Sequence, residues 1–254
     1  MRLELSVKSQ SVETSGITKD YKEALCEYIW NGFEANATRV ELTFVGNKLG
    51  GISEVIISDN GDGIDYTTLA DTFGAFLASQ KSGMSLQLKS KANKGKGRFS
   101  FLAFATNAQW KTVFAGEKSN LTYNISLDNI NKNECEVTEP VETDEATGSV
   151  VTITGVDSLK QEDVSCDELE ETLLQVFAWY LYLNKYKNIA LVINGTEVDY
   201  STFINSDMSL TKTVEIEKIP FVVTLIIWAE KIKENFCTYY LNGNSAVCGK
   251  DTTT

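Results

Sequence analysis

Residues 24–38, ALCEYIWNGFEANAT, form the segment that most constrains the fold of this chain. On a helical wheel that starts at Leu25 and advances about 100° per residue, Glu34, Glu27 and Asn31 fall at about 180°, 200° and 240°. Small, apolar and aromatic side chains occupy the rest of the circle. A helix of this kind must pack against other elements over most of its surface, and its three polar groups share one narrow stripe.

Two interpretations of this stripe are open from the helix alone. It is either the thin solvent-facing edge of an otherwise buried helix or the wall of a polar cavity. In a cavity, a carboxylate needs a partner, a metal or a ligand, because leaving a buried charge bare costs free energy. The choice between the two depends on other segments of the chain.

The segment IISDNGDGID, residues 56–65, leads from an apolar strand into an Asp-x-Gly-x-Gly turn. Gly61 and Gly63 allow the backbone to turn sharply and to approach a flat ligand closely. Asp59, at the end of the strand, can accept a hydrogen bond from an exocyclic amine. Ordinary turns and calcium loops share this composition, but the full EF-hand pattern is absent.

Two more segments join these. Residues 91–105, KANKGKGRFSFLAFA, place Gly95 and Gly97 before an apolar run, and the backbone amides of such a turn can hold phosphates with help from lysines. A flexible linker is the alternative, and the P-loop pattern GxxxxGK[ST] is missing. Residues 147–153, TGSVVTI, lead a Gly-Ser pair into a β-branched strand, which has no meaning by itself.

Composition narrows the class of protein. With 254 residues and 43% hydrophobic residues, the chain can bury a sizeable core. A net charge of −12 argues against a broad surface for nucleic acid or acidic lipid. The absence of histidine excludes Ser-His-Asp and Cys-His catalysis and the usual zinc sites. Five cysteines without CxxC spacing, no signal-peptide pattern and no membrane-length apolar run predict a soluble, cytoplasmic protein.

Hydrophobic periodicity predicts intermixed helices and strands, hence an α+β or α/β fold with a mixed sheet. Helices are expected at about 19–36, 66–78 and 167–184. Residues 99–106 fit either a helix or a strand. Strands are expected at 2–8, 39–45, 54–59, 109–114, 121–127, 149–154, 189–198, 212–217, 221–228 and 236–241.

The four segments together, in this order, resemble the motifs of the GHKL ATPase superfamily, which includes gyrase, the ninety-kilodalton heat-shock chaperones, histidine kinases, MutL and the MORC ATPases. The family's helix motif is Glu-x3-Asn-x2-Asp-Ala, and EYIWNGFEA supplies Glu27, Asn31 and Ala35, with Glu34 in place of the aspartate. DNGDG is similar to the adenine-binding motif, GKGRFSFLAFA to the phosphate-binding glycine motif, and GSVVTI to the Gly-Thr strand, with Ser149 replacing threonine. The resemblance is closest to the chaperone-, MutL- and MORC-like branch, and FLASQKSG resembles that branch's Ser-x-Lys segment.

The resemblance implies a Bergerat-type ATP-binding α/β sandwich and a role for each matching residue. Glu27 would be the catalytic residue that activates water, and Asn31 would bind magnesium. Asp59 would take the adenine amine with Ser149 and Gly63 helping through a water, while the role of Glu34 is left open. The implied ATP-binding residues are Asn31, Glu34, Asp59, Gly61, Gly63, Ser79, Lys81, Lys94, Gly95, Lys96, Gly97, Arg98 and Ser149, with ATP and magnesium as cofactors.

The resemblance also implies a division of the chain. Residues 1–204 would form the ATP-binding domain with a lid at about 74–97, and 205–254 would begin an incomplete transducer-like domain of a longer protein. The expected activity is magnesium-dependent ATP binding and slow hydrolysis that drives lid closure and dimerisation. The alternatives are an ATP-binding regulatory module without significant hydrolysis and a kinase-like domain that acts in trans. The expected partners are ATP, a second copy and other domains, not a membrane, and nucleic acid is not favoured.

Overall fold

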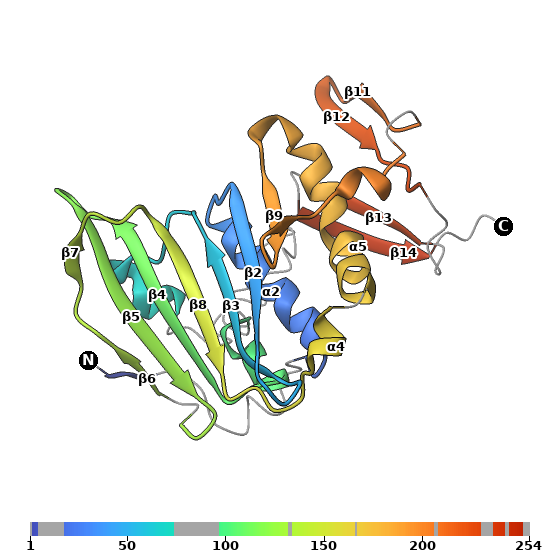
Figure 1. Cartoon of the computed structure of the whole chain (residues 1–254). Coiled ribbons are helices and arrows are strands. Elements are labelled where there is room, and N and C mark those ends of the chain that lie inside the picture. The colour runs from blue at the N-terminus through green and yellow to red at the C-terminus, as the bar shows by residue number, and fades with distance from the viewer. Residues whose placement is uncertain are drawn as a thin grey trace.

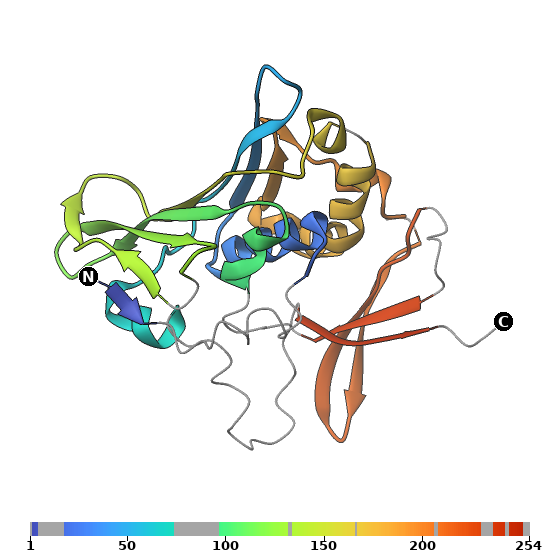
Figure 2. The ribbon, with the colours of Figure 1, turned by 90° about the horizontal axis from the view of Figure 1, so that it is seen from below.

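A single large mixed sheet organises the molecule, and helices cover one of its faces (Figure 1, Figure 2). The computed structural model describes residues 2–4, 18–73, 97–131, 134–165, 167–205, 208–229, 236–241 and 244–250. The mixed α+β class expected from the sequence is confirmed.

The sheet has ten strands in the order β1-β6-β5-β4-β8-β3-β2-β9-β10, with β7 paired to β5. Among the described strands, only β2 and β9 run parallel, and the chain between them passes through the helical layer. The strands are β1 (Arg2–Glu4), β2 (Arg39–Gly46), β3 (Ile52–Asp59), β4 (Asn107–Ala115), β5 (Asn120–Asp128), β6 (Glu134–Val137), β7 (Val141–Thr143), β8 (Gly148–Thr154), β9 (Ala190–Ile193) and β10 (Thr196–Glu197).

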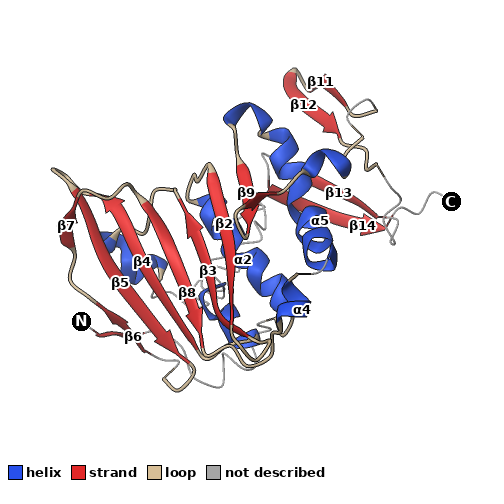
Figure 3. Ribbon diagram, viewed as in Figure 1, coloured by secondary structure: helices blue, strands red, loops and turns tan. Residues whose placement is uncertain are grey.

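Side chains of the central strands alternate between a buried and a more exposed face, as a sheet covered on one side requires. In β4, Ala108, Trp110, Thr112 and Phe114 are buried, and the residues between them up to Lys111 are exposed. Figure 3 shows that the helices lie together on one side of the sheet. The covered face therefore holds the core and any enclosed site.

The helices are α2 (Tyr21–Glu34), α3 (Leu69–Thr72), α4 (Gln161–Val164) and α5 (Asp167–Leu183), with short 3-10 helices η1 (Tyr66–Thr68), η3 (Gly97–Ala103), η4 (Lys185–Lys187) and η5 (Tyr200–Thr202). Helix α2 begins at Asp20, whose side chain accepts a hydrogen bond from the Lys22 amide at 2.8 Å, a usual N-cap. No described helix is long and apolar enough to cross a membrane.

Helices α2 and α5 pack through aromatic rings. The centroid of Trp30 lies 4.8 Å from that of Phe177, and the centroid of Phe33 lies 5.0 Å from that of Tyr180. Phe177 is fully buried. This contact holds α2 in place from one side, while the sheet holds it from the other.

Two antiparallel hairpins follow the large sheet without joining it: β11 (Leu210–Ile216) with β12 (Ile219–Leu225), and β13 (Phe236–Leu241) with β14 (Asn244–Lys250). Along β11–β12 the side chains of Leu210, Ile216 and Val223 are exposed. The strands predicted at 212–217, 221–228 and 236–241 are confirmed as β11, β12 and β13. The single strand predicted at 189–198 is instead two strands, β9 and β10, joined by a turn, and β6, β7 and β14 had not been predicted. The domain boundary near residue 205 stays a prediction.

Candidate functional site

The polar stripe of helix α2 faces away from the helix's packed sides. Asn31 and Glu34 are exposed and Glu27 is half-buried, while the residues between them, such as Tyr28 and Phe33, are buried. The stripe thus contains one carboxylate that is partly withdrawn from water and one amide that is open to it.

The hydroxyl of Tyr28, next to Glu27 in helix α2, forms two hydrogen bonds with the backbone of η3. It donates to the carbonyl oxygen of Arg98 at 3.2 Å and accepts from the amide of Phe101 at 3.2 Å. Burial raises the pKa of Tyr28 far above its usual range, so the hydroxyl stays protonated and keeps both contacts. The segment that follows the predicted lid is therefore held against the stripe.

Gly97, the first residue of η3, lies directly against the stripe. A Cβ atom added at Gly97 would lie 3.4 Å from Oε2 of Glu27 and 3.6 Å from Nδ2 of Asn31. The glycine backbone, the carboxylate and the amide therefore border one space. These three are the groups that the sequence assigned to the phosphate, the attacking water and the metal.

Arg98 is buried beside two aromatic rings. The Arg98 guanidinium is 6% exposed and lies 5.1 Å from the ring centroid of Phe73 and 5.2 Å from that of Phe99. Burial lowers its pKa to about 10, so it remains charged at neutral pH. Its phosphate-binding role stays a prediction.

Glu34, at the end of helix α2, acts electrostatically on helix α5. Burial raises the pKa of Tyr180 in α5, and the negative charge of Glu34 raises it further. Glu34 is thus close enough to α5 to act on Tyr180 electrostatically, and its part in nucleotide binding stays a prediction.

Asp59 ends strand β3 on the covered face. Its Oδ1 accepts from the Gly61 amide at 2.9 Å, and its Cα pairs with that of Ser149 across the sheet. Burial raises the pKa of Asp59, and hydrogen bonds from the Gly61 and Ser149 amides partly offset this rise. A half-buried carboxylate whose described partners include two backbone amides is suited to accept a further hydrogen bond from a ligand.

Gly32 connects the two ends of the site. A Cβ atom added there would lie 2.8 Å from Cγ2 of Val40 and 3.1 Å from Cβ of Asp59, so only glycine lets α2 cross the sheet this closely. Gly32 therefore lies against Asp59, with Asn31 directly before it in the helix and Glu27 about one turn earlier.

The turn after Asp59 needs its two glycines because backbone atoms crowd them. A Cβ on Gly61 would lie 2.4 Å from the carbonyl oxygen of Ala35, and a Cβ on Gly63 would lie 2.0 Å from that of Val113. Gly63 also has a φ of 72°, in the left-handed region. The amide of Asp62 donates to the Ala35 carbonyl at 2.8 Å, which ties the turn to the end of α2.

Thr112 is a polar residue of the site that the sequence analysis missed. It is fully buried, and its Oγ1 accepts from the Ile64 amide at 2.8 Å and lies 3.1 Å from Oγ of Ser149. Its Oγ1 also lies 3.4 Å from the carbonyl oxygen of Gly148. Thr112 thus joins the glycine turn to strand β8.

A signal for Thr112 was present in strand β4. The inward positions of this strand read Ala108, Trp110, Thr112 and Phe114, so one hydroxyl stands in an apolar row. A buried hydroxyl requires hydrogen-bond partners, and here the partners belong to the site.

Several predicted ligands cannot be placed. Ser79, Lys81, Lys94, Gly95 and Lys96 lie outside the described residues, as does the predicted lid except for its last residue, Gly97. The described site therefore consists of α2, the ends of β3 and β8, the start of η3 and the middle of β4.

Comparison with protein families finds one matching profile, described as histidine kinase-, DNA gyrase B-, and HSP90-like ATPase, over residues 19–162. This range contains α2, the glycine turn, η3 and β8. No curated protein matches the sequence.

Solved structures give two further likenesses. The N-terminal domain of a DNA repair protein superposes with a TM-score of 0.52 at 13% identity, covering 87% of this chain and 70% of that one. The Aquifex aeolicus MutL ATPase domain, solved with ADP, gives a TM-score of 0.43 at 16% identity and covers 72% of this chain. The chain spans 63% of the length of that MutL domain. At these identities the likeness concerns the fold, and the expected α/β sandwich is confirmed.

Proposed function

The chain belongs to the histidine kinase-, DNA gyrase B-, and HSP90-like ATPase family, and on this premise we propose that it binds ATP along helix α2 and hydrolyses it slowly with magnesium. The match supports ATP binding in general. The assignment of residues, the metal, the hydrolysis and the movements that follow are parts of the proposal.

At the adenine end, Asp59 accepts a hydrogen bond from the exocyclic amine of the base. Support comes from its half-buried carboxylate, whose partners in the structure include the amides of Gly61 and Ser149. Ser149 lies opposite Asp59 in the sheet and adds a hydroxyl to the same edge. Gly61 and Gly63 let the turn pack closely against the backbone of Ala35 and Val113, which fixes the position of the turn beside the proposed base site.

At the phosphate end, Glu27 orients the attacking water and accepts its proton as the water oxygen bonds to the γ-phosphorus. The bond from that phosphorus to the bridging oxygen breaks at the same time, and ADP leaves. Phosphoryl transfer depends mainly on positioning and on charge stabilisation. Glu27 would position the water, and the amides of the glycine segment together with magnesium would stabilise the charge on the phosphates. The observation that carries this proposal is the approach of Gly97 to both Glu27 and Asn31. It brings the glycine segment after the lid to the two helix residues that the chemistry requires.

The residues present fit magnesium rather than a metal held by protein alone. Within the described part of the chain, no group of three or more histidine, cysteine, aspartate or glutamate residues is arranged to hold a metal ion. Magnesium typically keeps several waters and binds through one or two protein ligands together with phosphates. The side-chain oxygen of Asn31 is the proposed ligand, and bound magnesium would neutralise charge on the phosphates.

Titration calorimetry tests the binding site. Wild-type protein should bind ATP more tightly with magnesium than without it, with ADP as the comparison ligand. Binding of wild-type strength by Asp59→Asn would refute the adenine assignment. Binding without any phosphate release by the wild type would instead favour the regulatory module without hydrolysis.

We further propose that ATP binding closes the segment at 74–97 and brings two copies of the chain together, as in the related branch of the family. The proposed place of action is the cytoplasm, in agreement with the cysteine content and the absence of CxxC pairs.

A further inference from the structure

A buried hydrogen-bond network next to the proposed adenine end joins Ile64, Thr112 and Ser149. The Ile64 amide donates to Oγ1 of Thr112 at 2.8 Å, and Oγ1 lies 3.1 Å from Oγ of Ser149. Thr112 is fully buried and therefore touches no ligand, whereas Ser149 is only partly buried. Whatever Thr112 does for a bound base, it does through Ser149 and the turn.

Counting the donors and acceptors of this hydrogen-bond network assigns its hydroxyl protons. A threonine hydroxyl has one proton and two acceptor lone pairs, and the Ile64 amide occupies one lone pair. The proton of Thr112 has two acceptors in reach, Oγ of Ser149 at 3.1 Å and the carbonyl oxygen of Gly148 at 3.4 Å. The shorter contact favours donation to Ser149. Ser149 then keeps its own proton for a group outside the protein.

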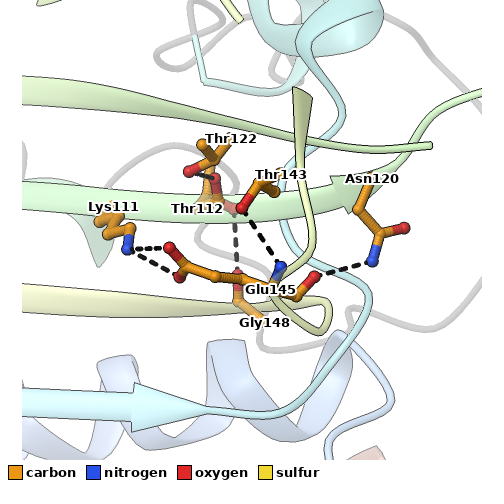
Figure 4. Close-up of polar contacts among 7 residues, drawn as sticks. All are labelled: Lys111, Thr112, Asn120, Thr122, Thr143, Glu145 and Gly148. Carbon is orange, nitrogen blue, oxygen red and sulfur yellow. Dashed lines mark hydrogen bonds and ion pairs between the residues drawn. The ribbon is translucent and has the colours of Figure 1, made fainter. Parts of the chain in front are cut away.

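The segment that carries Gly148 and Ser149 is also fixed from the opposite face of β4 (Figure 4). Lys111 contacts both carboxylate oxygens of Glu145 at 2.7 Å, and the side-chain amide of Asn120 donates to the Glu145 carbonyl at 2.9 Å. The entry into β8 is therefore held on both sides, so the Ser149 hydroxyl has a defined position relative to Asp59.

We propose that Thr112 is a positioning residue that sets the specificity for adenine by making Ser149 a hydrogen-bond donor. This inference rests on the proposed ATP site. Asp59 then presents an acceptor and Ser149 a donor, directly or through one water. Adenine presents the complementary pair, an amino donor and a ring-nitrogen acceptor, whereas guanine presents a carbonyl acceptor and an N–H donor at the same positions. Guanine would set its carbonyl against the Asp59 carboxylate.

The decisive variant is Thr112→Val, which keeps the shape of the side chain and removes the hydroxyl. Calorimetry with magnesium should show ATP affinity falling about ten-fold, with a smaller loss for GTP, because one hydrogen bond to the base edge is weakened. Thr112→Ser should restore ATP affinity. The matched control is Thr122→Val, because the Thr122 hydroxyl donates only to the backbone carbonyl of Thr112 at 3.1 Å. It should change the affinity by less than about two-fold.

A double-mutant cycle separates positioning from a general structural effect. In a Ser149→Ala background, Thr112→Val should cause little further loss of ATP affinity, because the group through which Thr112 acts is already gone. An undiminished loss in that background, or equal losses for ATP and GTP, would overturn this inference and leave the ATP site standing.

If Thr112→Val does not fold, Thr112→Cys serves, since a thiol is a weaker donor and acceptor. Wild-type protein that binds no ATP would overturn both this inference and the proposed function.

Discussion

At the scale of single residues, the site separates two carboxylates with different environments. Asp59 is surrounded by the sheet and the glycine turn, and burial raises its pKa. Glu27 is half-buried beside Gly97 on the helix. The partial desolvation of the Asp59 carboxylate costs stability in the free protein, and such a cost is expected where a ligand later supplies a contact.

Asp59→Asn should therefore abolish ATP binding and stabilise the free protein at neutral pH. Burial raises the pKa of Asp59 in the folded protein. The contribution of Asp59 to the free energy of unfolding is therefore fully present at low pH, where the carboxyl group is protonated in both the folded and the unfolded state. This contribution is lost as the pH rises through the pKa of the folded state. An asparagine keeps the acceptor for the Gly61 amide and carries no charge. The melting temperature of the variant should exceed that of the wild type at pH 7, and the gap should narrow as the pH falls towards about 4. A variant that melts lower than the wild type at pH 7 would contradict this argument.

Glu27→Ala should bind ATP nearly as well as the wild type and lose most hydrolysis. Water activation is needed in the transition state and not in the bound ground state, so the loss appears in turnover. A fall of about 100- to 10,000-fold in phosphate release is expected for the loss of a general base. Phosphate release at the wild-type rate would refute the role of Glu27.

Asn31→Ala is the companion variant, and it should behave differently. It should weaken ATP binding in the presence of magnesium and leave the weaker, metal-free binding unchanged. Titration of both helix variants with and without magnesium tests this difference. Equal affinity of Asn31→Ala and wild type in magnesium would remove Asn31 from the metal site.

At the scale of elements, η3 and helix α2 act as one unit because Tyr28 joins them. The Tyr28 hydroxyl is the hydrogen-bond partner of both the Arg98 carbonyl and the Phe101 amide. The position of Gly97 against Glu27 therefore depends on the hydroxyl of a buried tyrosine.

Tyr28→Phe should weaken the attachment of η3 to helix α2. Both backbone groups of η3 would lose their partner in a buried place, which should lower the free energy of unfolding by about 1–3 kcal/mol. Urea unfolding measures this loss, and phosphate release should also fall while affinity for ADP changes less. A variant with wild-type stability but reduced turnover would show that the hydroxyl acts on catalysis and not on packing.

The elements also show what could be predicted from the sequence. Helix α2 and strands β2, β3, β4, β5 and β8 were predicted because their periodicity is strong and their length is ordinary. Strands β6 and β7 were missed because they are short and interrupted by acidic residues. The run at 99–106 was ambiguous because its apolar residues fit either period, and tertiary contacts with Tyr28 and the core give it a 3-10 conformation. Thr112 was missed because a threonine is an ordinary residue in a strand.

At the scale of the whole molecule, charge governs how two copies approach. Each chain carries a net charge of −12, so two copies repel each other over distances comparable to the screening length, about 8 Å at physiological ionic strength. Under the proposed function, the free energy gained on nucleotide binding must exceed this repulsion for two copies to associate. The proposed dimer should therefore depend on salt.

The expected outcome is a protein that is mainly monomeric alone and forms a dimer with a non-hydrolysable ATP analogue and magnesium. Light scattering should show the mass double with saturating analogue, and the dimer fraction should increase as salt is raised, because screening weakens the repulsion. Asp59→Asn is the matched control, since it should remain monomeric at every analogue concentration while keeping its fold. A tight dimer without nucleotide, or a wild-type monomer that stays a monomer when the site is saturated, would show that ATP binding and association are not coupled in this chain.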